Sequence, residues 1–301
     1  MLLAVLLSGC AFNPAAEPPQ PPLIDLAALL TRVAARAQAD GLVGPEPAYR
    51  AALLADGMLS VALVVGTDDL GRVQVPATVD QRSCVVPAAV DGRQVRLAGR
   101  LVLSRAAFSR ALAECELLFV TSHSRYGAGP VFLEDGKAQP YRMQRSPGYE
   151  IVMPTDQVSG YAGTVVRRFV DPATRRDYTV FAADSTDLDA QQPLPGCQVL
   201  VLSTCSSRRH FADEIAAFRR GLPTVAICTR RPCLMDPQMR VFMRCVYAVL
   251  TGEPPAGIAA GLDREYNAVA WQHVRRREPP WRVIDTLYTV CLDTAGDDRM
   301  P

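Results

Sequence analysis

Residues 198–203 read Gln-Val-Leu-Val-Leu-Ser, a short and almost wholly apolar run. A run of this length and character predicts a strand that is buried on both faces of a sheet. Cys205 follows the last residue of the run by two positions. Residues 116–121, Glu-Leu-Leu-Phe-Val-Thr, predict a second strand of the same kind, and His123 follows its last residue by two positions. The sequence therefore puts a thiol and an imidazole just beyond two predicted core strands.

Strand and helix patterns alternate along the rest of the chain. Further strands are predicted at 59–66, 95–103 and 224–228, and helices at 23–39, 104–114, 210–220 and 237–251. This order predicts an α/β fold with a mainly parallel sheet and helices on both faces. Turn-forming residues are frequent from about 126 to 195, where short strand patterns occur at 164–170 and 178–182. We expect 126–195 to form an excursion from the main sheet.

The composition is that of a folded protein. Of the 301 residues, 49% are hydrophobic and 21% are charged, and the formal net charge is +1. The apolar fraction is too high and the net charge too small for a disordered chain. Nucleic acid is not expected as a partner, because neutralising phosphates requires a clear basic excess. The sequence also lacks an apolar run long enough for a membrane-spanning helix.

The N-terminus carries an export motif. Residues 7–10 read Leu-Ser-Gly-Cys after a short apolar run and resemble the lipobox of bacterial lipoproteins, whose cysteine is lipidated. The resemblance implies a lipid-anchored protein of the bacterial cell envelope, on the periplasmic face or the cell surface. Membrane contact is then through the N-terminal lipid only. No Lys or Arg precedes the apolar run, and the alternative interpretation is a buried or frayed N-terminal strand.

These features suggest three segments. We expect residues 1–10 to be the lipoprotein signal, ending in the lipidation residue Cys10. Residues 11–50 are expected to form a Pro-rich tether and a short helix. Residues 51–301 are expected to form the α/β domain.

The chain has nine cysteines, and eight remain when Cys10 is set aside. An exported protein permits disulfides, although spacing alone does not give the pairing. Cys228 and Cys233 are close enough in sequence to pair locally. They are poor zinc ligands because no second Cys/His pair follows at ligand spacing, so no metal site is expected. For most of the cysteines a buried thiol is the simplest interpretation.

His123 and Cys205 are the residues that point to chemistry. In open parallel sheets, sites form beyond the carboxyl ends of the strands. If the two predicted strands are neighbours, both side chains project into one crevice. A thiol at its ordinary pKa is mostly protonated, and a nearby imidazole takes its proton or stabilises the thiolate. His210, five residues after Cys205, is a competing base, but the end of a strand fixes geometry better than the start of a helix.

A strand ending in His and a later strand ending in Cys resemble the caspase-like (clan CD) cysteine peptidases, and the pattern is closest to CHAT and gingipain-type domains. The similarity continues beyond Cys205. Residues 218–227 resemble the family's helix, Gly turn and next strand, and 237–254 resemble the helix that follows. The resemblance covers roughly residues 59 to 255. It implies a three-layer sandwich.

The resemblance also implies roles for individual residues. Cys205 would be the nucleophile and His123 the general base and acid. Backbone N–H groups near Ser124 and Cys205 would form the oxyanion hole. Four further residues are expected to shape the pocket: Arg125, Tyr126, Gly127 and Ser206. No metal or organic cofactor is implied, although some family members use calcium. Ser124 stands where the family usually has Gly.

The expected function is that of an envelope-anchored cysteine endopeptidase acting on a peptide or protein substrate. The alternative is a catalytically inactive caspase-like domain that serves as a binding or scaffold lipoprotein. A third interpretation makes Cys205 an inert buried thiol and His123 a satisfied surface imidazole. An oxidising compartment adds a requirement, because Cys205 must then escape pairing with Cys197 or Cys228.

Overall fold

The structure is a computed structural model that describes residues 24–67, 83–124, 127–135, 137–144, 150–158, 163–182, 186–189, 191–231, 233, 238–274 and 286–295. The lipobox with Cys10 and most of the expected tether lie outside the described residues, as do two expected pocket residues, Arg125 and Tyr126.

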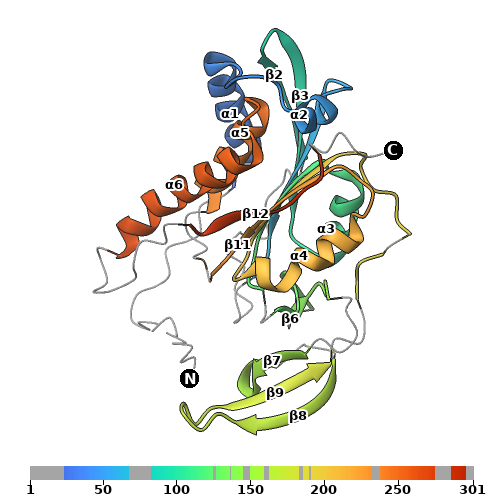
Figure 1. The fold of residues 1–301 in the computed structure, drawn as a ribbon, viewed down its shortest axis with the longest axis vertical. Helices are drawn as coiled ribbons and strands as arrows, with labels where there is room; N and C mark the ends of the chain where they lie inside the picture. Colours follow the sequence, from blue (N-terminus) through green and yellow to red (C-terminus); the bar gives the residue numbers. More distant parts are fainter. Residues whose placement is uncertain are drawn as a thin grey trace.

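The central sheet has seven strands in the order β12-β11-β10-β4-β1-β3-β2 (Figure 1). Their bounds are Met58–Val65 (β1), Ser83–Val90 (β2), Arg93–Val102 (β3), Leu117–Thr121 (β4), Gln198–Ser203 (β10), Thr224–Thr229 (β11) and Tyr288–Asp293 (β12). β3, β1, β4, β10 and β11 run parallel, whereas β2 and β12 pair antiparallel at the two edges. Every residue of β4 and β10 is buried, as expected for strands covered on both faces.

Helices cover both faces of this sheet (Figure 1). One face packs against α1 (Leu26–Asp40), α2 (Ala48–Leu53), α5 (Gln238–Leu250) and α6 (Pro255–Val274). The other face packs against α3 (Arg105–Glu114) and α4 (Ser207–Phe218). Alternate residues along each strand separate the two cores: Phe119 of β4 faces the first and Val120 the second. The predicted α/β fold, with a mainly parallel sheet and helices on both faces, is confirmed.

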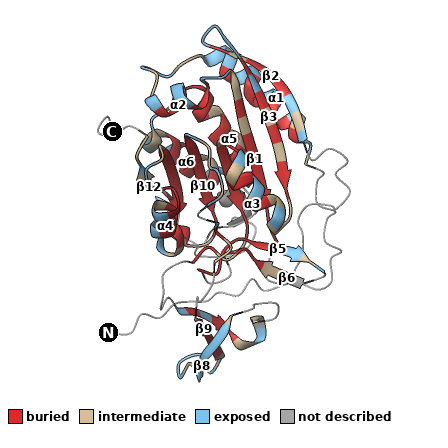
Figure 2. Ribbon diagram, turned by 90° about the vertical axis from the view of Figure 1, so that its right-hand side faces the viewer, coloured by how far each residue is buried: buried red, intermediate tan, exposed pale blue. Residues whose placement is uncertain are grey.

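Between β4 and β10 the chain leaves the central sheet. It forms a hairpin of β5 (Val131–Glu134) and β6 (Lys137–Pro140), and then a separate sheet in the order β7-β9-β8. The bounds of this small sheet are Glu150–Pro154 (β7), Thr164–Val170 (β8) and Asp177–Ala182 (β9), with a 3₁₀ turn at Thr155–Gln157. Figure 2 shows the small sheet set apart from the buried core, and β8 is exposed along its whole length. None of the described helices is long and apolar enough to cross a membrane.

Three parts of the fold differ from the sequence-based expectation. β2, β12 and α6 were not predicted. β2 contains Pro87, which lacks a backbone N–H and lies on an edge strand, where such a residue is tolerated. α4 begins at Ser207 rather than at 210. α1 and α2, from the segment expected to hold a tether and short helix, contribute Leu30 and Leu53 to the first core.

Candidate active site

The site lies where β4 and β10 end, side by side. The two strands are parallel neighbours, and their register pairs Thr121 with Ser203. His123 and Cys205 each lie two residues beyond these partners. Both therefore leave the sheet at the carboxyl ends of the two strands. The condition set from the sequence, that the two strands be neighbours, is met.

The Cys205 thiol contacts two groups that favour its ionised form. Its Sγ lies 3.8 Å from the Cys233 carbonyl oxygen, and the Cys233 thiol and the His123 imidazole are both close enough to affect its ionisation. The contact with Cys233, followed by that with His123, lowers the pKa of Cys205 well below its usual value, although burial acts in the opposite direction. The same thiol–thiol contact raises the pKa of Cys233. Of the two thiols, Cys205 is the one that carries the negative charge, because the His123 imidazole lies beside it. Both thiols are half-buried.

Backbone contacts with two other strands hold His123. Its N–H donates to the carbonyl of Thr67, just beyond β1, at 3.4 Å. The neighbouring Ser122 hydroxyl accepts from the N–H of Val131 at 2.7 Å and donates to the same residue's carbonyl at 3.1 Å. This packing leaves no room for a side chain at Gly66, because a Cβ there would lie 2.1 Å from Ser122 Oγ. The loop that carries the imidazole is thus tied to β1 and β5.

A second set of hydrogen bonds fixes the turn after Cys205. Ser206, an expected pocket residue, directly precedes α4, adopts a left-handed conformation (φ 54°), and its side chain makes no capping bond. Instead, the buried Ser207 hydroxyl donates to the carbonyl of Leu202 at 2.6 Å and accepts from the N–H of Thr229 at 2.8 Å. Cys205 therefore sits in a constrained strand-to-helix turn just before α4, whose N-terminal dipole favours a thiolate.

Gln144 joins the two halves of the site. Its Nε2 donates to the carbonyl of Gly127 at 3.1 Å, in the loop after His123, and to the carbonyl of His210 at 2.6 Å, in α4. The side chain is buried, and nothing in the surrounding turn-rich sequence marked it as part of the site.

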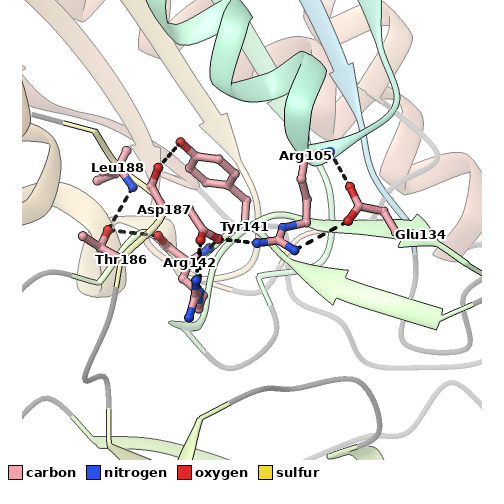
Figure 3. A network of polar contacts seen from close by, with 7 residues as sticks. All are labelled: Arg105, Glu134, Tyr141, Arg142, Thr186, Asp187 and Leu188. Carbon is pink, nitrogen blue, oxygen red and sulfur yellow. Dashed lines mark hydrogen bonds and ion pairs between the residues drawn. The ribbon is translucent and has the colours of Figure 1, made fainter. Parts of the chain in front are cut away.

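An ion-pair network anchors the strand segment that leads to Gln144 (Figure 3). The Asp187 carboxylate accepts from Arg142 Nη2 at 2.6 Å and from Arg105 Nη2 at 2.8 Å. Burial tends to raise the pKa of Asp187, but the hydrogen bonds from both arginines outweigh it and hold the pKa below its usual value. The Tyr141 hydroxyl donates to the Asp187 carbonyl at 2.7 Å, and Arg105 also pairs with Glu134 of β5. The network fastens the excursion to the N-terminus of α3.

The second histidine near Cys205 is held in a different state. His210 is half-buried, and burial, followed by the charge of Arg209, lowers its pKa to about 4. Cys205 acts on it in the opposite direction, which places the two groups near each other. His210 is therefore a neutral imidazole at neutral pH, whereas His123 is the imidazole that lowers the pKa of the Cys205 thiol.

The remaining expected pocket residues lie in the loop after His123. Ser124 is buried, and its carbonyl accepts from the N–H groups of Gly127 at 3.0 Å and Gly129 at 3.1 Å. Gly129 has φ 142°, and a Cβ there would lie 1.7 Å from the Tyr141 carbonyl oxygen. These contacts hold the loop in one shape, which only glycine allows at position 129.

The cysteines that contact each other are not the two that lie close together in sequence. The eight described cysteines are free thiols. Cys228, at the end of β11, makes its thiol contact with Cys291 of β12 and not with Cys233. Cys197 lies at the opposite end of β10 from Cys205, where it contacts the Tyr49 carbonyl. Cys233 was not predicted to be a neighbour of Cys205, although it lies only five residues after Cys228.

Comparisons with known proteins leave the site to be interpreted from its own geometry. No protein-family model, curated protein or solved structure matches this chain.

Proposed function

We propose that the protein is a caspase-like cysteine endopeptidase with Cys205 as the nucleophile and His123 as the general base and acid. The observation that carries the proposal is the placement of the Cys205 thiol beside the His123 imidazole, beyond the ends of two neighbouring parallel strands. An inert thiol has no need of an imidazole, a constrained turn and a helix N-terminus arranged around it.

The reaction follows from these positions. The Cys205 thiolate attacks the carbonyl carbon of the scissile peptide bond, and the oxygen becomes an oxyanion. Backbone N–H groups of Ser124 and Cys205 are the proposed donors to that oxyanion. The imidazolium of His123 gives its proton to the leaving amine as the C–N bond breaks, leaving a thioester on Cys205.

Hydrolysis of the thioester completes the cycle. His123, now neutral, takes a proton from a water molecule as the water oxygen attacks the thioester carbon. The C–S bond breaks, the acid product leaves, and the thiolate returns beside the imidazolium. Both half-reactions use only these two side chains and backbone donors.

Arginines beside the nucleophile support a substrate with negative charge near the scissile bond. Arg208 and Arg209 lie in the first turn of α4, and Arg230 and Arg231 follow β11, where the Arg231 carbonyl accepts from the N–H of Ser206. All four are exposed, and none forms an ion pair with a carboxylate of the described residues. We expect acidic peptides to be cleaved faster than basic ones of the same length, with a preference that weakens as salt rises.

The test is hydrolysis of a peptide library by the full chain, with products identified by mass spectrometry. Each library member has an acidic and a basic version. The native chain is expected to cleave peptide bonds, and Cys205→Ala to lose the activity. Cys245→Ala, which removes a fully buried thiol in α5, is the matched control for the loss of a cysteine. Equal cleavage by the native chain and Cys205→Ala would overturn the proposal.

We also propose that the chain is anchored in the bacterial cell envelope through a lipid on Cys10. The support is the lipobox at residues 7–10. Expression in a bacterium with a radiolabelled fatty acid tests it: label is expected on the native chain and not on Cys10→Ala. Equal labelling of both, or of neither, would contradict the anchor.

A further inference from the structure

The proposed hydrolysis does not use Cys233, yet the thiol of this residue lies against the nucleophile. Cys205 Sγ lies 3.8 Å from the Cys233 carbonyl oxygen, and the two thiols are close enough to shift each other's ionisation. The Cys233 thiol also contacts the hydroxyl of Ser203, the last residue of β10. Two half-buried thiols from separate parts of the chain thus meet at the edge of the sheet.

The Cys233 thiol contributes to the lowered pKa of Cys205, but an imidazole and a helix N-terminus can stabilise a thiolate without a second thiol. The second thiol has a cost as well, since two adjacent thiols are prone to oxidation as a pair. The described part of the chain contains a comparison. Cys228 and Cys291 also contact each other, but Cys228 is fully buried in the second core and has no imidazole partner among its contacts.

We propose that Cys205 and Cys233 form a redox-active dithiol that hydroperoxides convert reversibly to a disulfide. The oxidised form lacks the free thiolate at Cys205 and is therefore inactive as a peptidase. This regulatory consequence rests on the proposed function, whereas formation of the disulfide does not.

The chemistry has two balanced steps. The Cys205 thiolate attacks one oxygen of the peroxide, an S–O bond forms, the O–O bond breaks, and the leaving oxygen takes a proton. Cys205 is then a sulfenic acid. The Cys233 sulfur attacks the Cys205 sulfur, an S–S bond forms, and the S–O bond breaks. The hydroxide released takes the Cys233 proton and leaves as water. Two thiols lose two electrons, and hydrogen peroxide is reduced to two waters.

The reverse step needs a dithiol reductant. A thiolate of the reductant attacks Cys233 or Cys205, the S–S bond breaks, and the reductant's second thiol displaces the protein thiolate to give an oxidised, cyclic reductant. A compartment rich in oxidants therefore keeps the site in the inactive disulfide form, and a dithiol reductant restores the active thiolate. The same pair also keeps Cys205 from further, irreversible oxidation, since the disulfide forms from the sulfenic acid.

The experiment follows the sulfur atoms and requires no peptide substrate. The full chain is reduced, freed of reductant and treated with about one equivalent of hydrogen peroxide. Remaining free thiols are blocked with N-ethylmaleimide, and the digested chain is analysed by mass spectrometry. A peptide pair joined through Cys205 and Cys233 is the expected main oxidation product, formed before any link between Cys228 and Cys291. Dithiothreitol is expected to reverse it.

Two variants sharpen the result. In Cys233→Ser, the Cys205 sulfenic acid has no resolving thiol, so its adduct with dimedone is expected to rise several-fold, followed by sulfinic acid. Cys233→Ala gives the same result without a hydroxyl. In Cys291→Ser, the matched control from the other pair, the Cys205–Cys233 link is expected to form as in the native chain.

The outcomes separate the two proposals. A disulfide that forms in a chain without hydrolytic activity supports the dithiol and counts against the peptidase. Hydrolysis that persists unchanged after peroxide treatment, with no Cys205–Cys233 link, overturns the dithiol alone. Equal formation of sulfinic acid at Cys205 in the native chain and in Cys233→Ser would overturn it as well, because the second thiol would then play no part.

Discussion

The two ends of strand β10 carry cysteines in opposite chemical states. Cys197 immediately precedes the strand and Cys205 follows its last residue by two positions. Each sulfur lies 3.8 Å from a backbone carbonyl oxygen, that of Tyr49 for Cys197 and that of Cys233 for Cys205. Burial raises the pKa of Cys197 to about 11, whereas the contacts with Cys233 and His123 lower the pKa of Cys205.

The difference lies in the neighbours that the fold supplies at each end. Cys197 has the charge of Arg219 nearby, which favours the thiolate but does not overcome burial. Cys205 lies at the carboxyl end of parallel strands, where strand ends, loops and a helix N-terminus converge. The neighbouring Cys233 thiol and His123 imidazole are therefore what separates a reactive thiol from an inert one along a single strand.

The largest effect is expected from the imidazole at the Cys205 end. His123→Ala should lower kcat/KM for peptide hydrolysis by about 10²–10⁴-fold, because general acid–base catalysis is lost. His210→Ala, the matched control, removes an imidazole that is also near the thiol and should have a much smaller effect. Steady-state kinetics on the same peptide measure both. A larger loss in His210→Ala would reassign the base.

The pH dependence of alkylation separates the two kinds of thiol. Cys84 is the control matched for exposure: it is half-buried, and burial raises its pKa. The iodoacetamide rate at Cys84 should fall about tenfold for each pH unit below 9, since only the thiolate reacts. The rate at Cys205 should stay nearly constant over the same range, because its lowered pKa leaves it ionised. Parallel decline at both residues would remove the basis for an activated thiol.

Ser207 tests how much of the site's geometry depends on the turn after β10. Ser207→Ala leaves the carbonyl of Leu202 and the N–H of Thr229 without their hydroxyl partner, and it should lower the free energy of unfolding by about 2–4 kcal/mol. Ser206→Ala removes a hydroxyl that makes no capping bond and serves as the control. Urea unfolding followed by circular dichroism measures both. Equal stability of the two variants would show that the hydrogen bonds of the Ser207 hydroxyl contribute little to stability.

The smallest effect is expected from the anchor of the excursion. Asp187→Asn should lower the free energy of unfolding at pH 7 by about 1–2 kcal/mol, since its hydrogen bonds from two arginines lose their charge. The folded pKa of Asp187 is lowered, so its stabilisation is fully present above the unfolded pKa of about 3.9 and is lost as pH falls through the folded pKa. Unfolding curves of the native chain and variant should converge at low pH. A difference in the free energy of unfolding that does not change with pH would point to packing instead of charge.

The sequence predicted what depends on short-range pattern. Apolar runs gave the positions of β4 and β10, and the alternation of elements gave the fold class. The placement of His123 and Cys205 at one edge followed because parallel strands share the direction of their ends. β2 and β12 escaped prediction because edge strands carry weaker apolar patterns.

The rest of the site depends on contacts between distant segments. Gln144 reaches α4 across 66 positions, and Cys233 comes to Cys205 across 28. Neither residue type nor sequence spacing predicts these two contacts. Both contacts depend on how the excursion and the segment after β11 fold back on the sheet. From the sequence, Cys233 was noted only as close enough to Cys228 to pair locally, because proximity in sequence was the only available guide.

The most direct test of the central claim is the relative alkylation rate of the cysteines at neutral pH. The full chain is pulsed with dilute iodoacetamide, and labelled peptides are mapped by mass spectrometry, with His123→Ala run in parallel. We predict fast labelling of Cys205, slow labelling of Cys84, negligible labelling of buried Cys197, and slower labelling of Cys205 in the variant. A Cys205 that labels no faster than Cys84, or whose rate is unchanged in His123→Ala, would contradict the account.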